Sequence, residues 1–350
     1  MSRSSHVMLC CIHWKRLVRR TRHRYWLPIL GLILLAIVEL VLRISCGLGN
    51  PPLLQADIYT GYRFQPNQSL VRFGKRIRYN QYSQRSDPIA VPKPPTIWRI
   101  LMIGDSVLNG GNPIDQSDTI TELLRAMIQA TNQPAEVLNA SAGSWGIGNG
   151  LGYLQLFGTL DSDIVVLQIG AHDLYQPTST SEKLGRDPNF PNRRPWLALQ
   201  EVWSRYLWPR LALLLPSVQF RVDSPTVSTS NTTTPEMVAQ SNRQLLKTEV
   251  ALIRQHHRPV YILFVPGFPQ VYPPYAPVPY KAEFMQLAQS LQVPVLDLHQ
   301  QWLTLPASTV MTYFRDELHF TVAGNHAIAT ALFQLFCQQE DQPECSNIQP

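Results

Sequence analysis

The sequence has few cysteines, few charged residues and no acidic residue near its N-terminus. None of the Cys and His spacings is typical of a metal site, so we expect neither a metal nor another cofactor. The net charge of +6 suggests a nucleic-acid-binding surface, but residues 1–24 hold seven Lys/Arg and no Asp or Glu. The rest of the chain therefore has 23 basic and 24 acidic residues, and we expect no nucleic-acid partner.

One long apolar run follows this basic cluster. The stretch from Tyr25 to Arg43 is interrupted only by Glu39, and its length of about 17–20 residues suits one membrane-spanning helix. Positively charged flanks of such helices face the cytoplasm. We therefore predict a cytoplasmic tail over 1–24, a transmembrane helix over 25–43, and an extracytoplasmic remainder that is periplasmic or extracellular.

Three other interpretations of this run are weaker. A cleaved signal peptide would need a small-x-small cleavage site, and none follows. A lipoprotein signal at Cys46 fits badly, because Arg43 stands at the third position before it. A buried core helix is disfavoured by the dense basic flank. We therefore predict an uncleaved anchor.

The anchor also divides the cysteines between two compartments. Cys10 and Cys11 would be cytoplasmic and reduced, whereas Cys46, Cys337 and Cys345 would face an oxidising environment. Cys337 and Cys345 are close in sequence, so a disulfide between them would join a C-terminal helix to its tail. The sequence leaves open whether this bond forms.

Beyond the anchor, short apolar β-rich runs alternate with stretches of helical spacing. Nearly continuous apolar strands are typical of a parallel sheet that is buried on both faces. The alternation of β and α elements predicts a three-layer α/β/α domain with about five parallel strands. The predicted strands span residues 97–104, 135–140, 163–170, 259–266 and 294–298, and the predicted helices span 119–131, 236–257, 280–291 and 321–336.

The remaining segments flank or interrupt this domain. Residues 44–96 are rich in Pro, Gln and Tyr and form a juxtamembrane connector whose Pro-rich end predicts a stiff, extended chain. The α/β domain covers 97–340, with an insertion at about 176–235, and a tail over 341–350 follows. Part of the insertion has the pattern of an amphipathic helix interrupted near Pro209, and a Ser/Thr-rich stretch follows it.

A Gly-Asp-Ser motif ends the first predicted strand. Ligands of parallel α/β sheets bind beyond the carboxyl ends of the strands, and Ser106 lies two residues past such an end. Small neighbouring residues permit the sharp turn that exposes a nucleophile. A serine in this place is equally compatible with a turn residue that caps the next helix, so its function depends on partners elsewhere in the chain.

The segment RDELHFTVAGN, residues 315–325, offers those partners. A serine hydroxyl needs a base, and the pKa of histidine lies near neutrality, so His319 could take its proton. Asp316, three residues earlier, could accept a hydrogen bond from the other ring nitrogen and fix the tautomer. An isolated D-x-x-H is more often a surface turn, but this one directly precedes the last predicted helix.

Two further segments follow the second and third predicted strands. An acyl-transfer site needs hydrogen-bond donors aimed at the developing oxyanion. The stretch VLNASAGSWGIGN contains Gly143 and Ser144, either of which could offer a backbone N–H. The stretch LQIGAHDL contains His172, whose ring N–H could be another donor.

These segments together resemble the SGNH, or GDSL, hydrolase superfamily. The resemblance includes GYRFQPN and IRYNQYSQRSD, which look like the connector of membrane-anchored bacterial members. It implies a flavodoxin-like α/β/α fold, a Ser-His-Asp triad and ester hydrolysis without a metal. The four blocks are GDSV at 104–107, NASAGSWG at 139–146, GAHD at 170–173 and DELH at 316–319.

The resemblance implies a role for each candidate residue, and the chain departs from the family in two of them. In the second block the usual order is inverted, so Ser144 occupies the register of the family's glycine. In the third block His172 stands where the family has Asn. It is either a tolerated replacement that still lines the site or part of a reshaped hole with changed substrate or activity. The implied triad is Ser106, His319 and Asp316, and the implied oxyanion hole is Ser106, Gly143 or Ser144, and His172.

These features predict a membrane-anchored, extracytoplasmic serine esterase that hydrolyses acyl esters, such as O-acetyl esters of exported or cell-envelope polysaccharide. One alternative is an O-acyltransferase, which forms the same acyl-enzyme and passes the acyl group to a sugar hydroxyl. A second alternative is a non-catalytic protein that binds glycan through a degenerate site. The intact Ser106, Asp316 and His319 argue against this second alternative, and His172 argues for it.

Overall fold

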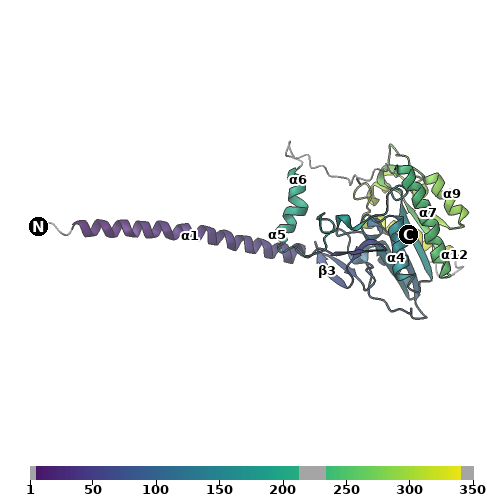
Figure 1. The fold of residues 1–350 in the computed structure, drawn as a ribbon, viewed down its shortest axis with the longest axis horizontal. Helices are drawn as coiled ribbons and strands as arrows, with labels where there is room; N and C mark the ends of the chain where they lie inside the picture. Colours follow the sequence, from purple (N-terminus) through teal and green to yellow (C-terminus); the bar gives the residue numbers. More distant parts are fainter. Residues whose placement is uncertain (1–4, 213–233, 340–350) are drawn as a thin grey trace.

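The computed structural model describes residues 5–212 and 234–339, without the side chains of residues 5–25 and 338–339 (Figure 1). A long helix, α1 (Ser5–Cys46), projects from an α/β domain that contains the rest of the described chain. The tail over 341–350 and most of the Ser/Thr-rich stretch lie outside the described residues, as does Cys345. Cys337, the other half of the disulfide considered above, is disulfide-bonded, and Cys46 is free.

A five-stranded parallel sheet forms the centre of the domain. Its spatial order is β6-β5-β7-β8-β9, so β5 lies between the two strands that follow it in sequence. This is the strand order of flavodoxin-like folds. The structure therefore confirms the predicted fold class and number of strands. The strands are β5 (Trp98–Gly104), β6 (Ala135–Ser141), β7 (Ile164–Gly170), β8 (Val260–Val265) and β9 (Val295–Asp297).

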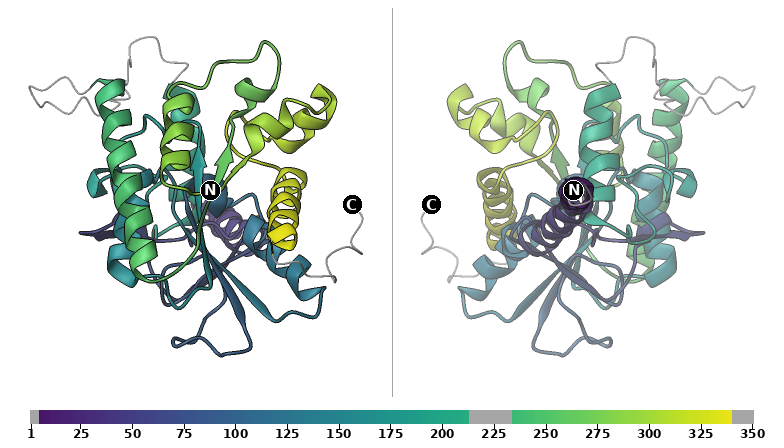
Figure 2. Two further views of the ribbon diagram at one scale, coloured as in Figure 1. Left: turned by 90° about the vertical axis from the view of Figure 1, so that its right-hand side faces the viewer. Right: turned by 90° about the vertical axis from the view of Figure 1, so that its left-hand side faces the viewer.

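Helices cover both faces of this sheet (Figure 2). On one face α3 (Ile120–Gln129) and α12 (Val322–Gln339) pack on the sheet around one apolar core. On the other face α7 (Pro235–Gln255) and α9 (Lys281–Ser290) enclose a second core. The four helices lie where the periodicity predicts them. Shorter elements are α2 (Ser106–Asn109), α8 (Phe268–Val271), α10 (Leu298–Trp302), α11 (Ala307–Tyr313), η1 (Gln116–Asp118) and η2 (Ser181–Lys183).

One long helix, α4 (Ile147–Phe157), has no counterpart among the predicted helices. Its first half contains Gly148, Gly150 and Gly152, and glycine is a poor helix former, which hides the element in the sequence. The helix packs against α7 and the connector. A Cβ added at Gly152 would lie 2.0 Å from the backbone oxygen of Tyr59. Close packing therefore requires glycine at this position.

The segment predicted as a connector contains two antiparallel hairpins. Their apolar side chains belong to the same core as α4, α7 and the sheet. Arg85 is fully buried and donates hydrogen bonds of 2.5–2.7 Å to the carbonyl oxygens of Asn109, Gly111 and Ile114. The segment is therefore an integral part of the domain. Its strands are β1 (Leu54–Asp57), β2 (Gly61–Phe64), β3 (Gln68–Arg72) and β4 (Lys75–Tyr79).

Among the described residues, α1 is the one helix long and apolar enough to cross a membrane. The candidate span Trp26–Cys46 has 21 residues and a mean hydropathy of 2.5, and none of it is buried by the domain. A signal sequence near an N-terminus has the same properties. The inserted segment contributes α5 (Ala198–Glu201), a π-helical stretch η3 (Val202–Leu207) and α6 (Trp208–Ala212). The irregular stretch precedes Pro209, where the sequence predicts an interruption.

We expect Gly152→Ala to destabilise the fold by about 1–3 kcal/mol, although alanine favours helix, because overpacking against a fixed backbone forces a shift. Urea unfolding followed by circular dichroism measures this loss. Gly148→Ala is the matched control, because an added Cβ there contacts only the side chain of Thr178, which can rotate. Equal stability of the two variants would contradict the inferred contact with Tyr59.

Candidate active site

The candidate nucleophile lies at the first residue of α2, directly after β5. Asp105 caps this helix, since its Oδ1 accepts a hydrogen bond of 2.8 Å from the N–H of Val107. A Cβ at Gly104 would lie 2.3 Å from Oε1 of Gln168, so a larger residue here would force the side chain of Gln168 to move. The turn leaves Ser106 half-buried, with its hydroxyl at the carboxyl edge of the sheet.

The structure brings His319 and Asp316 to this serine from a loop between α11 and α12. His319 Nε2 lies 2.9 Å from Ser106 Oγ, and His319 Nδ1 lies 3.0 Å from both carboxylate oxygens of Asp316. Partial burial opposes the charge of Asp316. However, the backbone N–H groups of His319 and Leu318, followed by the charge of His319, lower the pKa of Asp316. The three side chains thus form one hydrogen-bonded chain that ends on an ionised carboxylate.

The loop after β6 is held in place by the first hairpin. The hydroxyl of Tyr62 donates to the carbonyl oxygen of Gly143, and Gln176 Nε2 donates to the carbonyl oxygen of Ser144 at 3.0 Å. The backbone N–H groups of Gly143 and Ser144 donate to no residue in the part of the chain that the structure describes. Ser144 has a positive φ of 59°, which gives the turn its sharp form. The sequence offers no signal for the contribution of Tyr62.

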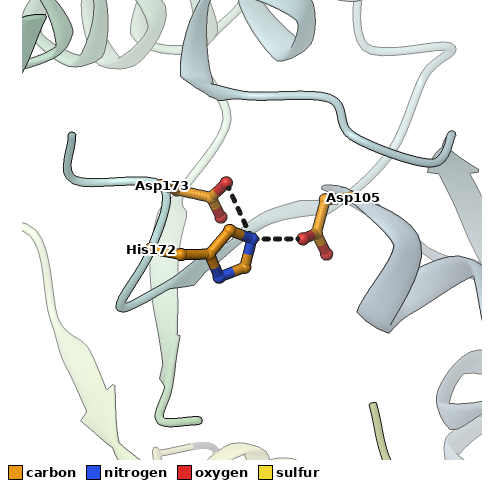
Figure 3. Close-up of side chains that lie close together, drawn as sticks. All are labelled: Asp105, His172 and Asp173. Carbon is orange, nitrogen blue, oxygen red and sulfur yellow. Dashed lines mark hydrogen bonds and ion pairs between the residues drawn. The ribbon is translucent and has the colours of Figure 1, made fainter. Parts of the chain in front are cut away.

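His172 follows β7, and its ring lies between two carboxylates (Figure 3). Its Nε2 is 2.9 Å from Oδ2 of Asp105 and 3.4 Å from Oδ1 of Asp173. Its Nδ1 is buried without a hydrogen-bond partner among the described residues. Donation from His172 to an oxyanion would require either that Nε2–H leave Asp105 or that the buried Nδ1 become accessible, so this role stays a prediction.

A family model described as the GDSL-like lipase/acylhydrolase family matches residues 102–327, which is more than half of the chain. The chain belongs to this family. The match begins within β5 and ends within α12, so it includes all of the candidate residues described above. Members of this family hydrolyse esters, and the chain is accordingly a GDSL-type hydrolase.

The solved structures that are similar to this chain match it at low sequence identity and with TM-scores below 0.5. The structure titled TesA is 14% identical, with a TM-score of 0.42, and the match covers 67% of this chain and 96% of that one. A lipase/acylhydrolase from Enterococcus faecalis is 16% identical, with a TM-score of 0.41 and coverage of 69% and 96%. The psychrotrophic esterase EstA from Pseudoalteromonas sp. is 14% identical, with a TM-score of 0.41 and coverage of 70% and 99%. No curated protein matches the chain.

The surroundings of His172 in this GDSL hydrolase favour its charged form. Burial opposes that charge, but the carboxylates of Asp173 and Asp105 outweigh it and raise the pKa of His172 to about 9. Burial also raises the pKa of Asp173, although the charge of His172 opposes the increase. The imidazolium therefore balances buried negative charge behind the nucleophile, which a neutral asparagine could not do.

The same three side chains have the donor atoms of a cation site. Their ligand atoms lie within 4.8 Å of one another, and no other such group occurs in the part of the chain that the structure describes. Histidine binds a metal only as the neutral ring. A cation would therefore have to displace the proton that His172 now shares with Asp105 and Asp173.

A cavity lies behind this cluster, between the sheet and the helices α4 and α7. Asp105, Asp173 and Glu249 line it together with Gln168. Glu249 on α7 is only 2% exposed, and burial raises the pKa of Glu249 to about 8. Sequence reasoning missed this residue. Glu249 lies three positions after buried Leu246, on the same face of α7, and a carboxylate on an apolar helix face is a detectable signal.

We expect His172→Asn to destabilise the protein most at low pH. The pKa of His172 is raised from 6.5 to about 9, so its ion pairs stabilise the fold fully below about pH 6.5 and lose this effect as the pH rises through 9. Removing one partner of a buried pair costs about 3–5 kcal/mol. Melting temperatures of parent and variant from pH 6 to 9.5 should therefore converge as the pH rises.

Two further variants separate charge balance from packing. His326→Asn on the exposed side of α12 is the matched surface control and should leave the melting temperature unchanged at each pH. Asp173→Asn added to His172→Asn removes one unbalanced carboxylate and should restore part of the stability. If the difference in melting temperature between the parent and His172→Asn stays constant from pH 6 to 9.5, the charge of His172 does not stabilise the fold.

Proposed function

We propose that the chain is a membrane-anchored serine esterase whose triad is Ser106, His319 and Asp316. The observation that supports this proposal is the hydrogen-bonded chain from Ser106 Oγ through His319 to Asp316. This order of hydroxyl, imidazole and carboxylate is the order that nucleophilic catalysis requires. Membership of an acylhydrolase family supports the same reaction class.

In the proposed reaction, Ser106 Oγ attacks the acyl carbonyl carbon while its proton passes to Nε2 of His319. His319 then returns this proton to the leaving alcohol, and an ester of Ser106 remains. In the second half, water attacks that ester and gives a proton to His319. His319 then returns this proton to Ser106 Oγ as the bond between Oγ and the acyl carbon breaks and the acid leaves. Asp316 holds the ring in the tautomer that these transfers need and stabilises its charged form.

Backbone groups would hold the oxyanion that forms at each attack. The N–H of Ser106 and that of Gly143 or Ser144 are the proposed donors, because none of them donates to another described residue. The sequence predicts His172 as a third donor. Its contact with Asp105 suggests a different role, in which it positions the nucleophile. Asp105 caps the helix that begins at Ser106, so His172 supports the turn that carries the nucleophile.

The proposed location of the domain is based on the helix α1. A positively charged segment precedes its apolar span, which favours a cytoplasmic N-terminus and an extracytoplasmic domain. Esters outside the cytoplasmic membrane would then be its substrates. We propose acyl esters of exported or cell-envelope polysaccharide, with O-acetyl esters as the class to test first.

We expect Ser106→Ala to abolish labelling by a fluorophosphonate probe and to lower esterase activity by on the order of 10⁴-fold. His319→Ala should have nearly the same effect, and Asp316→Asn should lower activity through the wrong tautomer. Release of acetate from an O-acetylated polysaccharide, measured for the full chain, tests the substrate. Hydrolysis at the parental rate by Ser106→Ala, with the fold intact by circular dichroism, would overturn the mechanism.

Topology has its own test. An alkaline phosphatase fused after Gly49 should be active, and a green fluorescent protein fused there should be dark, because the former requires an extracytoplasmic environment. Deletion of the basic residues in 1–24 should weaken this bias. Fluorescence without phosphatase activity at this junction would reverse the proposed orientation.

A further inference from the structure

The inserted segment exposes an unusual amount of apolar surface. We call residues 193–212 the arm, since they include α5, η3 and α6 and project from the domain (Figure 1). The side chain of Trp196 is 91% exposed and that of Trp203 is 52% exposed. Large exposed apolar groups that cluster on one element mark an interaction surface. Further exposed apolar side chains of the arm are Leu197, Leu207, Trp208 and Leu211.

The arm is attached to the apolar helix α1. Glu39 accepts hydrogen bonds from the N–H groups of Ala198 and Leu199, at 2.7 and 3.0 Å. Arg43 pairs with Glu39 at 2.6 Å and donates to the carbonyl oxygen of Trp196. Glu39, the one acidic residue in the apolar run, therefore binds the first residues of the arm's helical part.

A second set of contacts ties the arm to the connector. Arg72 and Glu201 form a buried ion pair of 2.5 Å, and the N–H of Gly49 donates to Glu201 at 2.7 Å. These contacts lie just after the end of α1 at Cys46 and near the base of the arm. The arm is therefore held from both sides at the junction of the helix and the domain.

The attachment point lies near the outer end of the apolar span. The span Trp26–Cys46 is 21 residues long, which corresponds to about 31 Å and matches the apolar thickness of a bilayer. Glu39 is seven residues from its outer end, or about 10 Å along the helix. Helices that lie in an interface bury their apolar face to about 5–10 Å. In Figure 1, α6 also lies crosswise to α1, as an element in the membrane plane would.

The charge of the arm suits an anionic surface. The arm contains four arginines and one acidic residue, Glu201, which is already paired with Arg72. Exposed Arg193 and Arg194 flank Trp196 along a groove beside the arm. Basic residues next to interfacial aromatic side chains are typical of segments that bind anionic phospholipids.

We propose that the arm lies in the outer interface of the bilayer that α1 crosses, with its tryptophans among the lipids and its arginines on anionic head groups. This inference rests on the proposed membrane anchor. It gives Glu39 a function, because the carboxylate is paired and bonded where the arm leaves the span. It also gives the enzyme a second membrane contact that fixes its orientation.

Tryptophan quenching in nanodiscs tests the arm in the full-length chain. The nanodiscs contain phosphatidylglycerol and phosphatidylcholine with bromine atoms near the head-group end of the acyl chains. The double variant Trp196→Phe with Trp203→Phe keeps the arm apolar but removes two fluorophores. The difference in emission between the parent protein and this variant reports Trp196 and Trp203. We expect brominated lipid to quench this difference strongly.

Two single variants make the outcomes distinguishable. Trp98→Phe removes a fluorophore of the domain, in β5. The difference in emission between the parent and this variant should be insensitive to bromine. Trp26→Phe, at the start of the span, reports whether α1 itself lies in lipid. Quenching of Trp26 without quenching of the arm would overturn the inference and leave the anchor intact, whereas no quenching of Trp26 would refute the anchor. If the arm is unquenched and the nanodisc contains two copies of the chain, the apolar face of the arm binds a second copy and the inference is wrong.

Discussion

The parallel pairing of β5 with both β6 and β7 is the constraint on which the candidate site depends. Because the three strands run in one direction, the loops that follow them leave at the same edge of the sheet. Ser106, Gly143 and His172 come from these loops and lie near one another for this reason alone. The loop before α12 then needs to reach only this edge to place His319 against Ser106. The strand order thus assembles residues that are separated by more than two hundred positions.

Charge balance under the nucleophile is a second constraint, and it explains how a histidine can replace the asparagine of the family. Asp105 caps the helix that begins at Ser106, so its carboxylate must remain buried and oriented. Asp173 adds another buried carboxyl group next to it, and burial of such groups is costly unless they are paired. The two carboxylates beside His172 raise its pKa, which favours the ring as the compensating cation. The replacement therefore changes the electrostatics beneath the site more than the shape of its rim.

The elements that obey simple periodicity could be predicted from the sequence, and the contacts between distant elements could not. The five strands and four long helices stand out because burial on both faces leaves continuous apolar runs and regular spacing. The three residues of the predicted triad lie in recognisable motifs that follow a strand or precede a helix, and the structure brings them within hydrogen-bonding distance of one another. Helix α4 was missed, because its glycines serve close packing against Tyr59, and this contact is visible only in three dimensions. Tyr62 was missed for the same reason, since it acts on Gly143, which is remote in sequence, whereas Glu249 was missed although its place on the apolar face of a helix is a sequence signal.

The connector illustrates why such contacts matter for function. Its composition suggested a spacer, yet Arg85 holds the loop that follows the nucleophile, and Tyr62 holds the loop that carries Gly143. The same segment reaches the arm through Arg72 and Glu201 at the end of α1. Residues of one segment therefore form hydrogen bonds both at the end of α1 and with the loops at the edge of the sheet. A flexible spacer would let the domain take any height and orientation above a membrane. In the proposed anchored enzyme these contacts would restrict both, so the position of an ester above the bilayer would contribute to substrate selection together with its chemistry.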